Sequence, residues 1–148
     1  MKIIEGGVCA AQGFTAGSIR CGIKESRTND DTAIIFSACE CTAAATYPMN
    51  RVKAAPVYVT MEHLENDVAR AIIANSGNAN ACAPDGMENA RRMAKAASKL
   101  LGVDEDDVVV ASTGVIGQRL PVECIEKHLP EIKLEENGSE KANLAIMT

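Results

Sequence analysis

The sequence predicts an α+β domain in which helices cover a β-sheet, and three observations support this class. Short apolar runs at residues 32–37, 71–74 and 108–111 are typical of strands buried inside a sheet. Residues 84–102 carry apolar side chains at helical spacing. Strands precede and interleave with helices, which is the order of a layered α+β or α/β domain. No internal repeat or linker divides residues 1–148, so we expect a single domain.

The first third of the chain is expected to consist of strands and turns. Residues 15–24 alternate weakly between apolar and polar and predict a strand, which the polar turn 25–31 separates from the strong strand at 32–37. Small, β-tolerant residues at 39–47 predict the returning strand of a hairpin. Residues 48–56 are bracketed by prolines, which exclude long regular structure there.

The middle of the chain is expected to supply two more strands. Residues 57–60 predict a short strand, and residues 61–66 a short helix or turn with Asp67 as a local cap. The apolar strand 71–74 runs directly into Asn, Ser and Gly residues at 75–80, whose side chains compete for backbone hydrogen bonds. We therefore expect a polar turn at the end of this strand.

Helices are predicted at three places in the second half of the chain. Residues 84–102 form the clearest one, with an apolar stripe facing inward, basic residues facing water, and Gly102 as the residue that ends it. Residues 121–128 predict a second helix that begins with proline. Ser139 is expected to cap a last helix over residues 140–147.

Composition and charge exclude several classes of function. With 47% hydrophobic residues and no apolar run of the roughly 20 residues that span a bilayer, the chain is expected to be soluble. Its N-terminus lacks the apolar core of a signal peptide, so we expect a cytoplasmic protein with free thiols at its six cysteines. The net charge of −5 and the absence of a Lys/Arg run disfavour binding to nucleic acid.

A metal site is not expected from the sequence. The one close cysteine pair, Cys39 and Cys41, is separated by a single residue, and a zinc site would require a second pair or a nearby histidine. His63 and His128 are distant from that pair and stand in surface-like contexts, so we expect structural rather than catalytic roles for both. No Ser-His-Asp or Cys-His pairing can be recognised from spacing alone.

The best candidate for chemistry is a pair of turns that end strands. Ser112-Thr113-Gly114 follows the strand 108–111, as residues 75–80 follow the strand 71–74. A glycine-bearing turn can direct N–H groups at a developing oxyanion, and the Thr113 hydroxyl would add a second kind of donor. On the residues alone, a tight turn without chemistry is favoured, and the Asn and Ser side chains at 75–80 are expected to be structural.

Six blocks of the sequence carry a resemblance to a known family: Gly6-Gly7-Val8 with Gly13-Phe14, Cys21-Gly22-Ile23-Lys24, Asn50-Arg51-Val52-Lys53-Ala54-Ala55-Pro56-Val57, Asn75-Ser76-Gly77-Asn78-Ala79-Asn80-Ala81-Cys82, Ser112-Thr113-Gly114-Val115-Ile116-Gly117 and Ala145-Ile146-Met147-Thr148. In this order they resemble the N-terminal (α) segment of the ornithine acetyltransferases of arginine biosynthesis, also called bifunctional glutamate N-acetyltransferases. The resemblance covers essentially the whole chain.

Members of this family are N-terminal-nucleophile enzymes, so the resemblance implies a layered α+β sandwich of the aminopeptidase and ornithine acetyltransferase type. It implies that a precursor cuts itself before a Thr, and that the α and β chains stay associated as an (αβ)2 heterotetramer. The new N-terminal Thr would take the acetyl group from N-acetylornithine and pass it to glutamate, which is covalent catalysis by a ping-pong route. This α segment lacks that Thr and would be completed by the β chain.

The resemblance also assigns roles to residues of this chain. Thr113 and Gly114 fall on the family's oxyanion hole, which makes an oxyanion site the favoured interpretation of that turn. Thr148 aligns with a Thr that contacts substrate. No metal or other cofactor is implied, although some members accept acetyl-CoA as the acetyl donor.

Three loops depart from the residues usual in the family, and they leave the substrate open. These loops are Cys9-Ala10-Ala11-Gln12, Tyr47-Pro48-Met49 and Ala83-Pro84. Two alternatives are therefore kept. An amidase or aminopeptidase of the same N-terminal-nucleophile architecture would pass the acyl group to water instead of an amine. A non-catalytic binding fragment derived from the family would need no partner chain.

Overall fold

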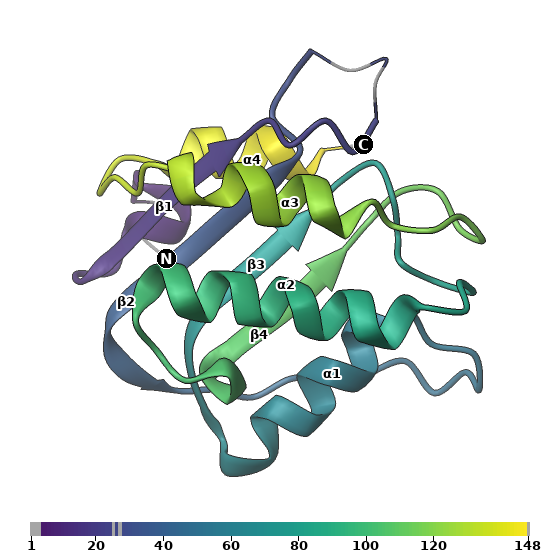
Figure 1. Ribbon diagram of the computed structural model, residues 1–148. Coiled ribbons are helices and arrows are strands. Elements are labelled where there is room, and N and C mark those ends of the chain that lie inside the picture. The colour runs from purple at the N-terminus through teal and green to yellow at the C-terminus, as the bar shows by residue number, and fades with distance from the viewer. Residues whose placement is uncertain (1–3, 25, 27, 148) are drawn as a thin grey trace.

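The computed structural model describes residues 4–24, 26 and 28–147 (Figure 1). Within these residues, four strands form one mixed sheet in the order β1-β2-β3-β4. The strands are β1 Phe14–Ile19, β2 Thr32–Thr42, β3 Val68–Asn75 and β4 Val108–Ser112. β1, β2 and β3 are antiparallel neighbours, whereas β3 and β4 run parallel.

Helices lie on both faces of this sheet, which confirms the predicted α+β class (Figure 1). The α-helices are α1 Ala55–His63, α2 Gly86–Leu101, α3 Val122–His128 and α4 Ser139–Ile146. Helices α1, α2 and α3 pack around one face and the β4 edge, and α4 packs on the other face against β1 and β2. The last three helices lie within two residues of their predicted bounds. None of the described helices is long and apolar enough to cross a membrane.

The larger core lies between the sheet and α2. Alternate strand residues point to this side because successive side chains of a strand face opposite ways. On the sheet these buried side chains are Ile34, Ile73, Val108 and Val110. On α2 they are Ala90, Met93, Ala94 and Ala97. The small alanines let the helix lie close to the sheet, so the core is closely packed although aromatic residues make up only 3% of the chain.

The strand predicted at residues 57–60 is wrong, because these residues lie within α1. Pro56 stands in the first turn of this helix, where a missing N–H leaves no hydrogen bond unmade. The Thr60 hydroxyl donates to Val110 O (2.9 Å) and accepts from Val110 N–H (3.1 Å). Helix α1 therefore supplies hydrogen bonds to the open edge of β4, and this tertiary contact outweighs the strand propensity of the β-branched residues.

His63 is part of the same contact, so the surface-like context expected for it is wrong. Its side chain is buried, and its Nδ1 lies 2.8 Å from Val108 O. Its Nε2 lies 3.8 Å from a carboxylate oxygen of Asp106. The histidine ties α1 to the start of β4, which is a structural role of the kind expected.

The hairpin predicted over residues 39–47 is also wrong. β2 does not turn back after Ser37 but continues to Thr42 and pairs with β3 as Cys41↔Ala69 and Thr42↔Val68. The register of the two strands shifts between Phe36 and Cys41. Such an irregularity bends a strand without ending it, and it leaves no signature in the composition that distinguishes one long strand from two short ones.

Ser139 begins α4 but is not its cap, so that prediction is wrong. Gly138 occupies the cap position, and no side chain caps this helix. The Ser139 hydroxyl instead donates to Gly6 O and accepts from Cys9 N–H (2.9 Å). It fastens the N-terminal loop to α4 across 130 residues of sequence, a partner that local sequence could not indicate.

The buried carboxylate of Asp31 organises the connection between β1 and β2. Its Oδ1 accepts from Cys21 N–H (2.7 Å), and its Oδ2 accepts from Gly22 N–H (2.9 Å) and Ile23 N–H (2.8 Å). Its backbone carbonyl also accepts from Ser76 N–H (2.8 Å). Asp31 thus joins the β1–β2 loop to the end of β3, although the sequence suggested only a solvated turn residue.

Replacing this carboxylate should destabilise the fold. In Asp31→Asn, one acceptor oxygen becomes an NH2 group that faces backbone N–H groups, so we expect the free energy of unfolding to fall by about 2 kcal/mol or more. Asp30→Asn is the matched control, because among the described residues Asp30 contacts the Ser18 hydroxyl (2.6 Å), not a cluster of backbone N–H groups, and its position is half-buried. Its effect should stay below about 1 kcal/mol in chemical denaturation. Equal effects of the two variants would contradict the role of Asp31.

Candidate functional site

The two turns singled out in the sequence lie side by side at the ends of β3 and β4. The parallel pairing places Asn75 opposite Ser112, so both chains leave the sheet at the same end (Figure 1). Backbone hydrogen bonds continue beyond the strands. Thr113 N–H donates to Asn75 O (2.9 Å), and Val115 N–H donates to Gly77 O (3.3 Å). The turns therefore form one unit, as their similar positions in the sequence suggested.

The asparagine side chains of the first turn are buried and tie it to its surroundings. Asn75 Nδ2 donates to Asn78 O (2.9 Å), which closes the turn on itself. Asn78 Nδ2 donates to Arg119 O (3.1 Å), and its Oδ1 accepts from Asn80 N–H (2.8 Å). Asn80 Nδ2 donates to Gly86 O (2.9 Å) at the start of α2. These contacts give the three asparagines the structural role expected of them.

Gly114 stands where the two turns approach most closely. Its φ is 134°, which L side chains rarely adopt. A Cβ on this residue would lie 2.3 Å from the carbonyl carbon of Gly77 and 2.5 Å from Asn78 N. The two backbones touch here with no side chain between them, so glycine is required at position 114.

The turn offers two different hydrogen-bond donors to solvent. The N–H of Thr113 is engaged with Asn75 O, so Thr113 can contribute only its hydroxyl. The N–H of Gly114 has no hydrogen-bond partner among the described residues, and both residues are exposed. A hydroxyl and a fixed amide at neighbouring positions can together stabilise one negatively charged oxygen.

The C-terminal end of α4 reaches the same place from the other face of the sheet. The buried Ser76 hydroxyl donates to Ala145 O (2.6 Å) in the last turn of this helix. Figure 1 shows α4 ending on the side of the molecule toward which β3 and β4 point. Thr148, the expected substrate-binding residue, lies outside the described residues.

Comparison with known proteins bears on this arrangement. The sequence profile of the ArgJ family matches residues 15–148. The chain is 42% identical to the arginine biosynthesis bifunctional protein ArgJ of Caldanaerobacter subterraneus subsp. tengcongensis. It is 41% identical to the glutamate N-acetyltransferase of Methanocaldococcus jannaschii, and both similarities cover the whole chain. The chain belongs to the ArgJ family.

The solved structures of the ArgJ family have the same fold. The ArgJ protein of Bacillus halodurans superposes with a TM-score of 0.91 at 37% identity, covering 97% of this chain and 76% of that one. Ornithine acetyltransferase of Mycobacterium tuberculosis, solved in complex with ornithine, gives 0.90 at 36% identity, covering 97% and 79%. The chain spans 37% and 36% of the lengths of the two relatives compared by sequence. The fold expected from the resemblance is confirmed.

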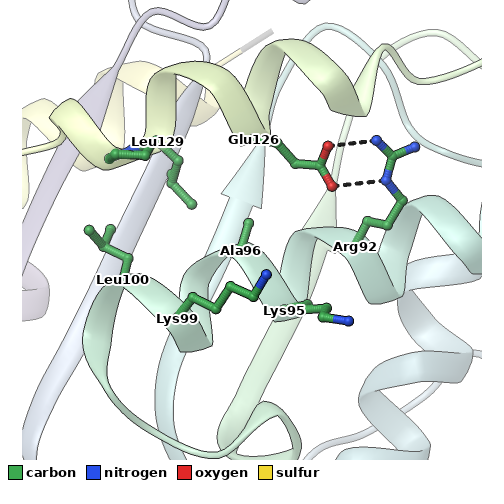
Figure 2. Close-up of a pocket in the computed structure, with 8 residues that line it drawn as sticks. Arg92, Lys95, Ala96, Lys99, Leu100, Glu126 and Leu129 are labelled. Atoms are coloured by element: carbon green, nitrogen blue, oxygen red, sulfur yellow. Dashed lines mark hydrogen bonds and ion pairs between the residues drawn. The ribbon is translucent and has the colours of Figure 1, made fainter.

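A separate hollow of about 530 Å³ lies between α2 and α3, and its lining includes no residue of the two turns. Figure 2 shows a polar contact at its edge, in which the Arg92 guanidinium donates two hydrogen bonds, of 2.9 and 2.6 Å, to the Glu126 carboxylate. Arg92 also pairs with Glu123 (3.0 Å), which pairs in turn with Arg119 (2.7 Å). A backbone hydrogen bond and these two guanidinium groups lower the pKa of Glu123 to about 2. The hollow is bordered by a solvated ion-pair network, as predicted for the basic face of α2.

The cysteines of this ArgJ-family chain are free thiols, as expected. Burial raises the pKa of Cys21 to about 12, so this thiol is protonated and a poor nucleophile at neutral pH. Cys39 and Cys82 are exposed. Among the described residues, no group of three or more His, Cys, Asp and Glu side chains is placed to hold a metal ion.

The environment of Cys21 predicts a large difference in alkylation rate. With a pKa of about 12, only about one part in 10⁴ of the thiol is ionised at pH 8. We expect iodoacetamide to modify Cys21 at least about 100-fold more slowly than the exposed Cys39 and Cys82. Peptide mass spectrometry against time would measure the rates, with urea-unfolded protein as the control in which all six cysteines react. Comparable rates in the folded protein would contradict the burial of Cys21.

The close approach at Gly114 predicts a severe effect of adding one methyl group. Gly114→Ala would place its Cβ against the backbone of Gly77, and we expect a loss of about 3 kcal/mol or more in unfolding free energy. Gly117→Ala is the matched control, because φ is 80° there but nothing lies within 4 Å of the added Cβ. It should lose about 1 kcal/mol. Denaturation midpoints that fall equally would show that strain, not contact, dominates at both positions.

Proposed function

We propose that this chain is the α segment of an acetyltransferase that moves the acetyl group of N-acetylornithine to glutamate. A separate β chain would carry the Thr nucleophile, and the α segment would supply the oxyanion hole. The observation that carries the proposal is the adjacent pair of donors, the Thr113 hydroxyl and the unengaged Gly114 N–H, in a chain of the ArgJ family. Relatives are named for acetyl transfer to glutamate and for arginine biosynthesis.

The chemistry assigns a definite role to each donor. The Thr hydroxyl of the β chain adds to the acetyl carbonyl of N-acetylornithine, and the carbonyl oxygen becomes negatively charged. Thr113 Oγ1–H and Gly114 N–H would donate to that oxygen. The amine of ornithine then leaves with a proton, which gives an acetyl-threonine intermediate. The amine of glutamate attacks this ester through the same kind of oxyanion, and the Thr hydroxyl is released.

A partner that covers the turn is supported by the exposed apolar surface around it. Val115 and Ile116, which follow the donors, are 41% and 64% exposed. A second apolar area, separate from the turn, lies on the sheet face opposite α2, where a hollow of about 350 Å³ is lined by residues including Ile35, Ile72 and Val109. Oxyanion donors are effective in a site that excludes water, so burial of this region by the β chain would serve the reaction directly.

The lengths of the relatives support a separate α chain. This chain covers 37% of the Caldanaerobacter relative but 76% of the solved Bacillus halodurans chain. The solved chain therefore corresponds to only part of a protein of the relative's length, which is in keeping with a precursor cut into α and β. We propose an (αβ)2 assembly in the cytoplasm, where free cysteines stay reduced. We propose no cofactor, with acetyl-CoA as an alternative acetyl donor.

The first experiment is the intact mass of the protein produced from its native gene, measured under denaturing conditions. A second chain that begins with Thr, together with transfer of acetyl from N-acetylornithine to glutamate, is the expected result. Release of free acetate without transfer would favour an amidase of the same architecture. A single folded species without either activity would overturn the proposal and leave a binding fragment.

The proposed oxyanion hole predicts a specific defect in Thr113→Ala. Loss of one donor should lower kcat by about 100-fold while KM changes by less than about threefold, because the oxyanion exists only in the transition state and intermediates. Thr113→Ser keeps the hydroxyl and should stay within about tenfold of wild-type kcat. Steady-state kinetics of acetyl transfer would measure both, and wild-type kcat in Thr113→Ala would contradict the assignment.

A further inference from the structure

Ser76 connects the oxyanion turn to the place where the chain leaves α4. Its side chain is completely buried, and its hydroxyl donates to Ala145 O at 2.6 Å, across 69 residues of sequence. Its own N–H donates to Asp31 O (2.8 Å). The next residue, Gly77, lies against Gly114 without an intervening side chain. The dipeptide Ser76-Gly77 therefore contacts both the end of α4 and the turn that carries Thr113 and Gly114.

This hydrogen bond anchors the last turn of α4 to the turn that follows β3. The final carbonyl groups of a helix have no partner within the helix, and the Ser76 hydroxyl supplies one to Ala145. The neighbouring side chains contribute little burial, since Leu144, Ile146 and Met147 are 54%, 41% and 58% exposed. Ala145 is buried but offers only a methyl group. The Ser76 hydroxyl therefore contributes to the direction in which the chain leaves α4.

We propose that Ser76 is a positioning residue for acetyl transfer, acting through Ala145 rather than touching substrate. By fixing the chain as it leaves α4 relative to Thr113 and Gly114, it sets the distance between the oxyanion donors and the segment that follows. The inference rests on the proposed function, because it assumes that in the uncut precursor this following segment leads to the Thr that becomes the nucleophile. A displacement of about 1 Å at such a site can reduce a rate about 100-fold.

The test compares Ser76→Ala with Ser98→Ala in the protein produced from its native gene. Ser98 is the matched control, since it is also buried and its hydroxyl also donates to a backbone carbonyl, Lys95 O at 3.3 Å within α2. We expect Ser76→Ala to lower kcat at least about tenfold and to slow self-cleavage, with KM within about twofold of wild type. Ser98→Ala should leave kcat, KM and the rate of self-cleavage unchanged. Hydrogen exchange of the α4 amides should rise in Ser76→Ala alone.

The outcomes separate this inference from the proposed function. If the wild-type protein transfers acetyl and Ser76→Ala retains wild-type kcat, the positioning role is overturned and the proposed function stands. If both serine variants lose activity equally, the effect is general destabilisation and the positioning role is again overturned. If the wild-type protein transfers no acetyl group, the proposed function and the positioning role of Ser76 are both overturned. Should Ser76→Ala fail to fold, Ser76→Cys keeps a weak donor, and a lowered kcat with unchanged KM in that variant supports the role, whereas wild-type kcat overturns it.

Discussion

The contact between the backbones of Gly77 and Gly114 is the constraint on which the rest of the site depends. A Cβ at position 114 would lie 2.3 Å from Gly77, so the two turns can meet only because residue 114 has no side chain. The contact extends the parallel pairing of β3 and β4 beyond the sheet, through the hydrogen bonds of Thr113 and Val115. Among the described residues, the Gly114 N–H has no backbone acceptor in this arrangement. It is therefore held in place by the contact and still able to donate a hydrogen bond to another molecule.

Other parts of the fold converge on this contact and hold it in place. The Asp31 carboxylate secures the β1–β2 loop, and its backbone carbonyl accepts from Ser76. Ser76 in turn receives the end of α4, while Asn80 reaches the start of α2. Several buried polar groups of this region thus bond to backbone atoms of other elements, which restrains the turn. Stiffness is what electrostatic stabilisation of a transient charge requires, because donors that are already oriented need not rearrange during the reaction.

The exposed surfaces of the chain fall into two kinds. The helical side around α2 and α3 carries ion pairs such as Arg92 with Glu126. The opposite sheet face and the donor turn expose apolar side chains, including Ile72 and Ile116 at 37% and 64%. The chain spans about a third of its relatives' length, and the β chain of the proposed assembly would cover these apolar side chains. At the donor turn, such a cover would also exclude water from the proposed oxyanion site.

Patterns of neighbouring residues determined much of this protein, and tertiary contacts decided the rest. Helical spacing was sufficient for α2, apolar runs for the centres of β3 and β4, and the Asn-rich and Gly-bearing turns for the place of the candidate site. Residues 57–60 were predicted as a strand but are helical. The hydrogen bonds of Thr60 to the edge of β4 favour the helix, and they are not visible in the local sequence. The length of β2 depends on a register shift that composition does not record. Asp31 and Ser76 were hidden for the same reason: their partners lie in other elements, and short-range sequence carries local propensity but not the long-range hydrogen bonds that override it.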